Sequence, residues 1–163
     1  MNMPTKTISV TFGALFALPF VLMVFVLQPI LGKKKAIKSA GKLLSHYSSF
    51  VFRLFIPASK SAGEYSFFQQ KLKRNYLILA SLNDLTIQQE TKDLIEFRVN
   101  FCPVSMILRK FSMADLCKYS CAGDWITAKN NQNNWVFKRD QTIGTGGKYC
   151  NHTYCRIETN QIF

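Results

Sequence analysis

An uninterrupted apolar segment constrains the fold of this chain more than any other feature of its sequence. Residues 8–32 read ISVTFGALFALPFVLMVFVLQPILG, with no charged side chain and a single glutamine. About 20 apolar residues in a helix cross the hydrocarbon core of a bilayer, so this segment can span a membrane with some tilt. Pro19 lies within the segment, and membrane helices tolerate proline better than soluble helices do. The sequence therefore predicts a transmembrane helix over residues 8–32, preceded by a short tail of residues 1–7.

The positive charge of the chain is concentrated beside this segment. The formal net charge is +12, and no acidic side chain precedes Glu64. Lysines occupy positions 33–35 directly after the apolar segment, whereas Lys6 is the only charged side chain before it. By the positive-inside rule, the sequence predicts a single-pass protein with a cytoplasmic C-terminal domain. Because the lysines adjoin an apolar run, we expect contact with the bilayer and its anionic headgroups through residues 8–42, and no nucleic acid partner.

Two other interpretations of the apolar segment compete with a membrane span. A cleaved signal peptide has its positive charges before the apolar run and a small-residue cleavage site after it, and this sequence has neither. A core helix of a soluble domain is seldom apolar on all sides over such a length. Both fit the pattern less well than a membrane span does.

The rest of the chain changes from helical to strand periodicity. Residues 33–57 place apolar side chains at helical spacing among lysines, which predicts a basic amphipathic helix next to the membrane. Residues 65–82 repeat the helical pattern, whereas residues 86–92 are polar and indicate no particular element. Residues 94–102 alternate apolar with polar side chains, as a half-buried strand does. Further expected elements are a helical turn at 104–109, a short helix at 113–121, and strands at 135–139 and 149–157.

The order of these elements predicts the fold class. Helices come first and strands later, which is typical of an α+β domain whose helices pack on a small antiparallel sheet. We expect this domain over residues 58–163. The glycines of the segment 144–147 are expected to form a hairpin turn between the last two strands, with positive φ angles.

All five cysteines fall in this second part of the chain: Cys102, Cys117, Cys121, Cys150 and Cys155. An odd number is unsuited to a disulfide framework, and a cytoplasmic location keeps thiols reduced. A zinc site is one alternative, because residues four apart on a helix or two apart on a strand share a face. Its ligands would be Cys117, Cys121, Cys150 and His152. Since the spacing lacks the paired Cys-x-x-Cys of structural zinc sites, we expect no cofactor.

Nucleophilic catalysis is the other chemistry that these residues permit. A cysteine reacts as its thiolate and needs a nearby histidine or positive charge. Cys150 or Cys102 would be the nucleophile and His152 the base, unless His152 is simply a surface residue of its strand. Asp124 is open to three interpretations: the N-cap of a helix, which is the default, a charge partner for Arg139, or a binding group for a cationic substrate.

An ordered set of short motifs connects residues 101–156 with a known family. They are Phe-Cys-Pro (101–103), Asp-Leu-Cys (115–117), Cys-Ala-Gly-Asp (121–124) and VFKRDQTIGTGGKYC (136–150). They resemble the L-2-amino-thiazoline-4-carboxylic acid hydrolase family, whose pattern has Cys-Pro, Leu-Cys, Cys-x-x-Asp, Arg-x-x-Thr and a closing Gly-x-x-Cys-Asp-Phe. This chain departs from the pattern in Cys150-Asn151-His152, which replaces Cys-Asp-Phe, and in its N-terminal apolar segment.

The resemblance implies a membrane-anchored hydrolase that opens a small cyclic amidine or thiazoline carboxylate at a C–N or C–S bond, toward cysteine. In such a reaction Asp124 would hold the amidinium, and Arg139 or Arg98 would bind the carboxylate of the substrate. A thiolate or an activated water would attack the C2 carbon while a histidine moves protons. The residues expected in catalysis are Cys150, His152 and Cys102.

A function without catalysis remains as an alternative. The strand, Gly-Gly turn and strand that end in Tyr-Cys also resemble the tail of small-ligand sensor domains of the 4-vinyl-reductase type. A membrane-tethered sensor of this type binds a small molecule in an apolar pocket, which the 14 phenylalanines of the chain would suit. In either case we expect Cys102, Asp124, Arg139, Cys150 and His152 to converge on one pocket.

Overall fold

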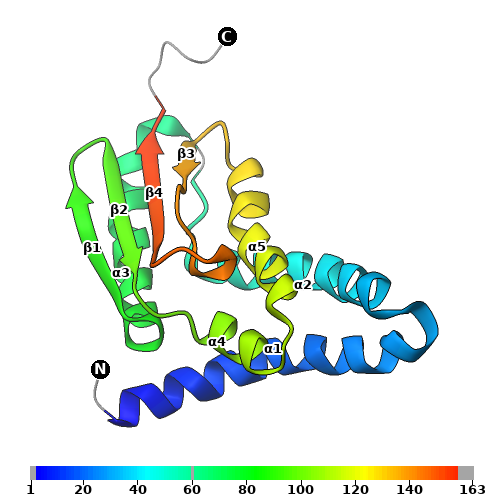
Figure 1. Ribbon diagram of the computed structural model, residues 1–163. Helices are drawn as coiled ribbons and strands as arrows, with labels where there is room; N and C mark the ends of the chain where they lie inside the picture. Colours follow the sequence, from blue (N-terminus) through cyan, green and yellow to red (C-terminus); the bar gives the residue numbers. More distant parts are fainter. Residues whose placement is uncertain (1–2, 60, 158–163) are drawn as a thin grey trace.

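The computed structural model describes residues 3–59 and 61–157, and the first part of this chain is helical. Helix α1 (Met3–Leu31) and helix α2 (Lys33–Phe55) are separated only by Gly32. The φ of Gly32 is +74°, a left-handed conformation that glycine adopts without steric cost, so the chain turns back on itself there. Figure 1 shows the resulting hairpin projecting away from the sheet. Of the predicted tail, residues 1–2 lie outside the described residues and residues 3–7 belong to α1.

The strands form one antiparallel sheet in the order β1-β2-β4-β3. Their bounds are β1 (Leu85–Glu90), β2 (Leu94–Val99), β3 (Trp135–Lys138) and β4 (Cys150–Arg156). The alternating pattern from residue 94 is thus a strand, although it ends at Val99 because Pro103 already begins the next helix. Strand β1 occupies part of the polar segment 86–92. Its side chains are mostly exposed at an edge of the sheet, and only Leu85 and Ile87 are half-buried before the register shifts, so the alternation in the sequence is short.

The remaining helices lie before the sheet or between its strands β2 and β3. They are α3 (Tyr65–Asn83), α4 (Pro103–Lys110) and α5 (Cys117–Lys129), with short 3-10 turns at Ala62–Glu64, Ala114–Leu116 and Ile143–Thr145. The predicted turn at 104–109 is helix α4. Of the glycines in the segment 144–147, only Gly146 has a positive φ, because a 3-10 turn replaces the expected tight hairpin.

Helix α5 extends well beyond the predicted short helix of residues 113–121. Gly123 does not end it, because this glycine lies where α5 packs directly on α2. A Cβ atom at Gly123 would stand 2.5 Å from the Cβ of Ser48, closer than side chains can approach. Asp124 therefore lies inside α5, and its interpretation as a helix N-cap is wrong.

One face of the sheet carries the core, and α3 lies behind this sheet in Figure 1. Buried aromatic side chains from α3 and three strands pack together there. We call this group the sheet cluster; its large members are Tyr65, Phe68, Tyr76, Phe97, Trp135, Phe137 and Tyr154. The α+β fold with helices on a small antiparallel sheet is thus confirmed.

A second core lies between the helices. It joins the inner sides of α1, α2 and α4, and we call it the helical cluster; it includes Phe16, Ala17, Phe20, Leu44, Ile107, Leu108 and Leu116. By length and composition, Lys6–Leu31 of α1 qualifies as a membrane span, a property that core helices and signal sequences share. The helical cluster joins side chains on both sides of residues 32 and 57, where the sequence predicts domain boundaries. The sheet cluster includes Ile56, just before the second of these boundaries.

Candidate functional site

A cavity of about 100 Å³ lies where the two clusters meet. Its walls are largely apolar and include Phe12 and Phe16 of α1 and Leu79 of α3. Polar and thiol side chains also line it, among them Cys121 and Asp124 of α5, Arg139 after β3, Cys150 and His152 of β4, and Cys102 at the start of α4. The structure thus places five of the residues expected from the sequence around one cavity.

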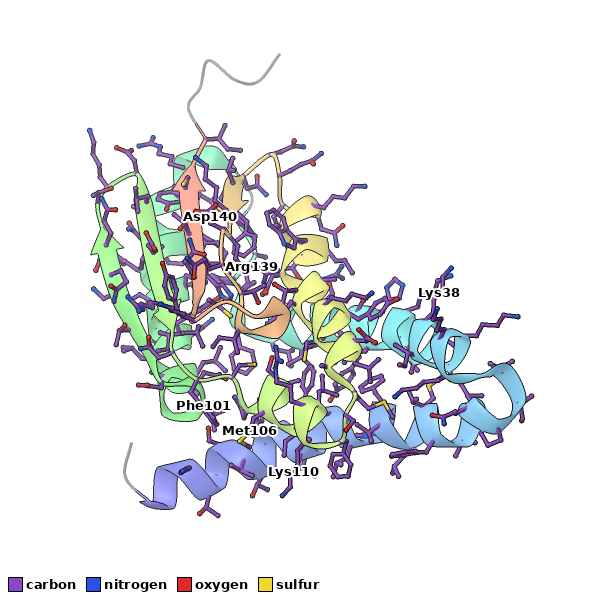
Figure 2. The ribbon with its side chains drawn as sticks, in the orientation of Figure 1. Lys38, Phe101, Met106, Lys110, Arg139 and Asp140 are labelled. Carbon is purple, nitrogen blue, oxygen red and sulfur yellow. The ribbon has the colours of Figure 1, made fainter. Side chains whose placement is uncertain are left out.

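Strand pairing explains how these residues come together. The central strand β4 pairs with β2, where Cys150 stands opposite Val99, and with β3, whose last residue precedes Arg139. Cys150 and His152 are two apart on β4, so both side chains point to the covered face of the sheet. Helix α5 brings Asp124 to the same place from the other wall (Figure 2 shows Arg139 between the sheet and α5).

A buried ion pair forms the centre of the polar group. Arg139 Nη1 lies 2.5 Å from Asp124 Oδ2, and its Nη2 donates to the carbonyl oxygen of Cys121 at 2.9 Å. Both charged side chains are at most 6% exposed. Of the three interpretations of Asp124, the structure supports the charge partner of Arg139. The other carboxylate oxygen, Asp124 Oδ1, is buried and has no hydrogen-bond partner among the described residues.

His152 lies beside this ion pair and is buried, so it is not the exposed strand residue that the sequence left as an alternative. Its Nε2 stands 3.8 Å from Asp124 Oδ2, and its Nδ1 is 3.3 Å from the hydroxyl of Tyr76. That hydroxyl in turn lies 2.8 Å from the hydroxyl of Tyr154. Burial lowers the pKa of His152, although the carboxylate of Asp124 opposes this effect. The imidazole is therefore neutral at pH 7 and can accept a proton.

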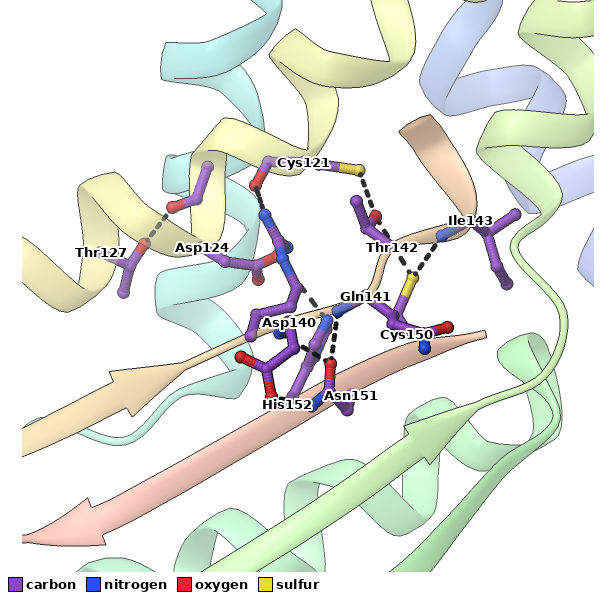
Figure 3. A network of polar contacts seen from close by, with 12 residues as sticks. Cys121, Asp124, Thr127, Asp140, Gln141, Thr142, Ile143, Cys150, Asn151 and His152 are labelled. Carbon is purple, nitrogen blue, oxygen red and sulfur yellow. Dashed lines mark hydrogen bonds and ion pairs between the residues drawn. The ribbon is translucent and has the colours of Figure 1, made fainter. Parts of the chain in front are cut away.

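Cys150 is held by the turn that precedes β4. The backbone N–H of Ile143 donates to Cys150 Sγ at 3.2 Å, and Thr142 Oγ1 lies 3.4 Å from the same sulfur (Figure 3). Thr142 Oγ1 also lies 3.3 Å from the sulfur of Cys121, so the thiols of Cys121 and Cys150 both contact the same hydroxyl group. Burial raises the pKa of Cys121 to about 12, so that this thiol stays protonated.

Cys102 has a structural position as well as a place in the cavity wall. It is the N-cap of α4, where its sulfur accepts a hydrogen bond from the backbone N–H of Ser105 at 3.5 Å. Burial raises the pKa of the Cys102 thiol, and raises those of Cys117 and Cys155 as well. A thiol that is protonated and committed to a cap is a poor nucleophile. Its expected catalytic role has less support than that of Cys150.

The remaining expected site residues lie elsewhere or do not group together. Arg98 is on the open face of the sheet, where its guanidinium stands 4.0 Å from the centre of the Tyr149 ring, and it is not part of the cavity wall. All five cysteines lie in the described part of the chain and form no disulfide there. Within residues 3–59 and 61–157, no three His, Cys, Asp or Glu side chains group so as to hold a metal ion.

Several residues of the site have no signature in the sequence. Tyr76 reads as one apolar position of a helical stripe, and only the fold shows that its hydroxyl reaches His152. Asn151 faces away from the cavity. Its Oδ1 accepts hydrogen bonds from the backbone N–H groups of Asp140 and Gln141, at 3.0 and 2.9 Å, and so fixes the chain that leads from Arg139 to Thr142 (Figure 3).

Comparison with known proteins agrees with the motifs in the second half of the chain. No curated protein and no solved structure matches the chain. The family model described as L-2-amino-thiazoline-4-carboxylic acid hydrolase matches residues 14–154. This match begins within α1, so most of the apolar helix is part of the family domain and not an addition to it. Because the match covers most of its length, the chain belongs to the L-2-amino-thiazoline-4-carboxylic acid hydrolase family.

Proposed function

We propose that the protein is a hydrolase that opens a small cyclic amidine, with Asp124 binding the amidinium. The observation that carries this proposal is that Asp124 lines the cavity and that its buried Oδ1 atom has no hydrogen-bond partner within residues 3–59 and 61–157. A buried acceptor left unpaired is costly, so a ligand that donates an N–H group there is favoured. The exocyclic nitrogen of a protonated 2-amino-thiazoline is such a donor. Protonation also makes the adjacent C2 carbon more electrophilic.

The size and polarity of the cavity support a small substrate. A water-sized group needs roughly 10–15 Å³ of such space, so the cavity of about 100 Å³ suits a single small ring with few substituents. The apolar walls would cover the ring, while the polar groups face one side of it. Water would be largely excluded, which strengthens the interaction between the amidinium and Asp124.

The proposed reaction adds water across C2 of the ring. Neutral His152 takes a proton from the attacking water, and the new oxygen becomes bonded to C2. The C2–S bond then breaks, and the sulfur leaves as a thiol with the proton returned to it, which gives a urea-bearing thiol. In the thiolate variant, Cys150 attacks C2 first, the ring C2–S bond breaks and the ring sulfur leaves as a protonated thiol. Water then adds to C2 of the resulting enzyme-bound isothiourea, and the C2–Cys150 bond breaks to give the urea and the free Cys150 thiol.

Arg139 has a different part in this proposal from the one expected from the sequence. Its guanidinium already pairs with Asp124 and the carbonyl of Cys121, so it positions the carboxylate. A substrate carboxylate would have to share this cation with Asp124. We therefore propose that the carboxylate of a thiazoline substrate contributes little to binding.

The test compares two substrates with the purified full-length chain. Incubation with L-2-amino-thiazoline-4-carboxylate and with 2-amino-thiazoline should release one free thiol per ring opened, at similar kcat/KM for both. Cys150→Ser abolishes turnover if the thiolate attacks and leaves much of it if water attacks. Cys155→Ser is the matched control, because Cys155 lies on the same strand outside the cavity wall and should retain full activity.

Failure of this test has a defined meaning. Saturable binding of both amidines without ring opening would contradict hydrolysis and favour the small-ligand sensor. Absence of binding in the wild-type chain would contradict the amidinium role of Asp124.

The proposal also includes attachment to a membrane through α1. It is supported by the length and hydropathy of that helix and by the lysines beside it. A cytoplasmic location of the domain stays a prediction, as does contact between anionic headgroups and the lysines of the segment 8–42.

A further inference from the structure

We propose that α1 lies in the plane of a membrane, with its outer face in one leaflet of an anionic bilayer, and that it does not cross that bilayer. The inference concerns a surface of the molecule and does not depend on the reaction proposed above. It follows from the two sides of α1, which differ in what they contact.

The inner side of α1 is fixed to the domain along most of its length. Buried positions recur every three or four residues, at Ser9, Gly13, Ala17, Val21 and Val24. A Cβ atom at Gly13 would stand 2.7 Å from Pro103, so α1 and the start of α4 touch backbone to backbone. The hydroxyl of Ser9 donates to the carbonyl oxygen of Leu82 at the end of α3. This side of the helix has no room for lipid.

The outer side of α1 is an exposed apolar stripe. Its large side chains recur at intervals of seven or four residues and are Ile8, Leu15, Leu22, Val26 and Ile30, each 61–79% exposed. At 1.5 Å per residue the stripe from Ile8 to Ile30 is roughly 33 Å long. A contiguous apolar face of this kind on an otherwise folded domain marks a surface that meets a partner or a membrane.

A crossing arrangement conflicts with what α1 packs against. The hydrocarbon core of a bilayer is about 30 Å thick, so a spanning α1 would carry its packed neighbours into that core. Those neighbours bear exposed cations, of which Lys38 on α2 and Lys110 on α4 are labelled in Figure 2. A charged side chain at that depth is strongly unfavourable. An in-plane helix keeps its inner contacts and exposes only the apolar stripe to lipid.

The charges favour an anionic bilayer over a second copy of the chain as the occupant of this face. Lys6 precedes the stripe and the lysines of positions 33–35 follow it, all of them exposed, and no acidic residue occurs before Glu64. Two copies meeting through this face would bring like charges together. Anionic headgroups neutralise the same lysines, and the apolar stripe can then enter the boundary between headgroups and acyl chains.

The first experiment determines on which side of the membrane the two ends lie. The full-length chain with a protease-cleavable tag at each end is bound to sealed vesicles of phosphatidylcholine and phosphatidylglycerol, and protease is added outside. An in-plane α1 leaves both tags accessible, so both are cleaved. Protection of the N-terminal tag alone would show that α1 crosses the bilayer and would overturn the proposal. Because this arm uses the unsubstituted chain, it does not depend on how any variant folds.

The second experiment uses a matched pair of leucines. Leu22 on α1 and Leu77 on α3 are 62% and 61% exposed. We expect Leu22→Glu to weaken binding to these vesicles by roughly tenfold or more, because the charge must leave water, whereas Leu77→Glu should have little effect. Equal effects of the two substitutions would contradict the proposal. So would absence of vesicle binding together with self-association that Leu22→Glu abolishes, since a second copy would then cover the face.

Discussion

The two apolar cores of this protein differ in the kind of side chain that fills them. The sheet cluster is aromatic, and its rings meet at defined angles: Phe68 stacks on Trp135 with ring centres 5.3 Å apart, and Tyr76 on Phe97 at 4.1 Å. The helical cluster consists mainly of aliphatic and small side chains, and its helices approach closely where glycines replace side chains. The sheet cluster depends on large rings that fill its interior, whereas close helix packing depends on positions that lack a side chain.

This difference also affects how the polar groups of the cavity between the two cores are held in position. In the sheet cluster, hydroxyl groups hold the rings in place, as when Tyr65 donates to the carbonyl oxygen of Tyr154 at 2.6 Å. His152 takes its position from this framework through Tyr76. Asp124 takes its position from the close contact of α5 with α2 at Gly123. Substitutions on the two sides of the site should therefore affect stability and activity in different ways.

The largest expected effect tests whether the sheet cluster depends on filled volume. Trp135 is 1% exposed, and Trp135→Ala should lower the free energy of unfolding by about 3–5 kcal/mol. Trp125 is 45% exposed, so Trp125→Ala is the matched control with a much smaller effect. Denaturant unfolding followed by circular dichroism measures both. Similar losses for the two tryptophans would mean that the sheet cluster is not the tightly packed side.

The next effect tests the close contact between α5 and α2, where Gly123 leaves no room for a side chain. Gly123→Ala places a Cβ atom against Ser48, and overpacking of this kind should cost about 1–3 kcal/mol despite the better helix propensity of alanine. It should also reduce kcat/KM, because Asp124 is the next residue. Gly63→Ala is the control, since a Cβ atom there meets nothing closer than 3.7 Å. If Gly123→Ala leaves the free energy of unfolding unchanged, α2 and α5 can move apart without cost.

A smaller effect concerns the boundary between the two cores and depends on pH. The folded-state pKa of His152 lies below the ordinary value of 6.5, so the unfolded chain binds a proton at pH values where the folded chain does not. As the pH falls below about 6.5, stability should therefore fall, by at most about 1.4 kcal/mol per pH unit. His152→Phe should remove this part of the slope, and substitution of the exposed His46 by Gln should leave it unchanged. An identical slope in the His152→Phe variant would exclude this histidine as its source.

The smallest effect is expected outside both cores. Lys73 and Glu90 form an ion pair of 2.7 Å whose side chains are about 40% exposed. Glu90→Gln should cost less than about 1 kcal/mol, and the cost should vanish at high salt. Unfolding measured at low and high salt checks this. A larger and salt-independent loss would show that the edge strand β1 contributes more than its exposure suggests.

The elements of the fold that could be predicted are those in which one buried side repeats regularly along the sequence. Apolar runs and regular alternation revealed α1, α2, α3 and β2, because burial on one side leaves a period in the sequence. Strand β1 has only two half-buried apolar residues, Leu85 and Ile87, and the register shift that follows them ends the alternation, so its period is too short to recognise in the sequence. The end of α5 was placed too early because Gly123 resembles a helix stop, whereas its cause is a contact with Ser48, far away in the sequence.

The site was only partly predictable, for a related reason. Local spacing places Cys150 and His152 on one face of a strand, and the chain order brings Arg139 near them. The burial of His152 and its contact with Tyr76 arise from pairing between residues 76 positions apart, which no local pattern records. For Asp124, spacing left three interpretations open, and only the packing of α5 distinguishes them.

The hydrogen bonds of Asn151 bear on how sequences in this family diverge. The family pattern has an aspartate after its last cysteine, and this chain has an asparagine. The Oδ1 atom of Asn151 accepts two backbone N–H groups on the side away from the cavity, which a carboxylate oxygen can also do, whereas its Nδ2 donates to Asp140 Oδ2 at 3.4 Å, which a carboxylate cannot do. Exchange of these two residue types at this position should accordingly keep the two backbone hydrogen bonds but depend on whether residue 140 is an aspartate, and the presence of Asn in a sequence gives no reason to regard its active site as degenerate.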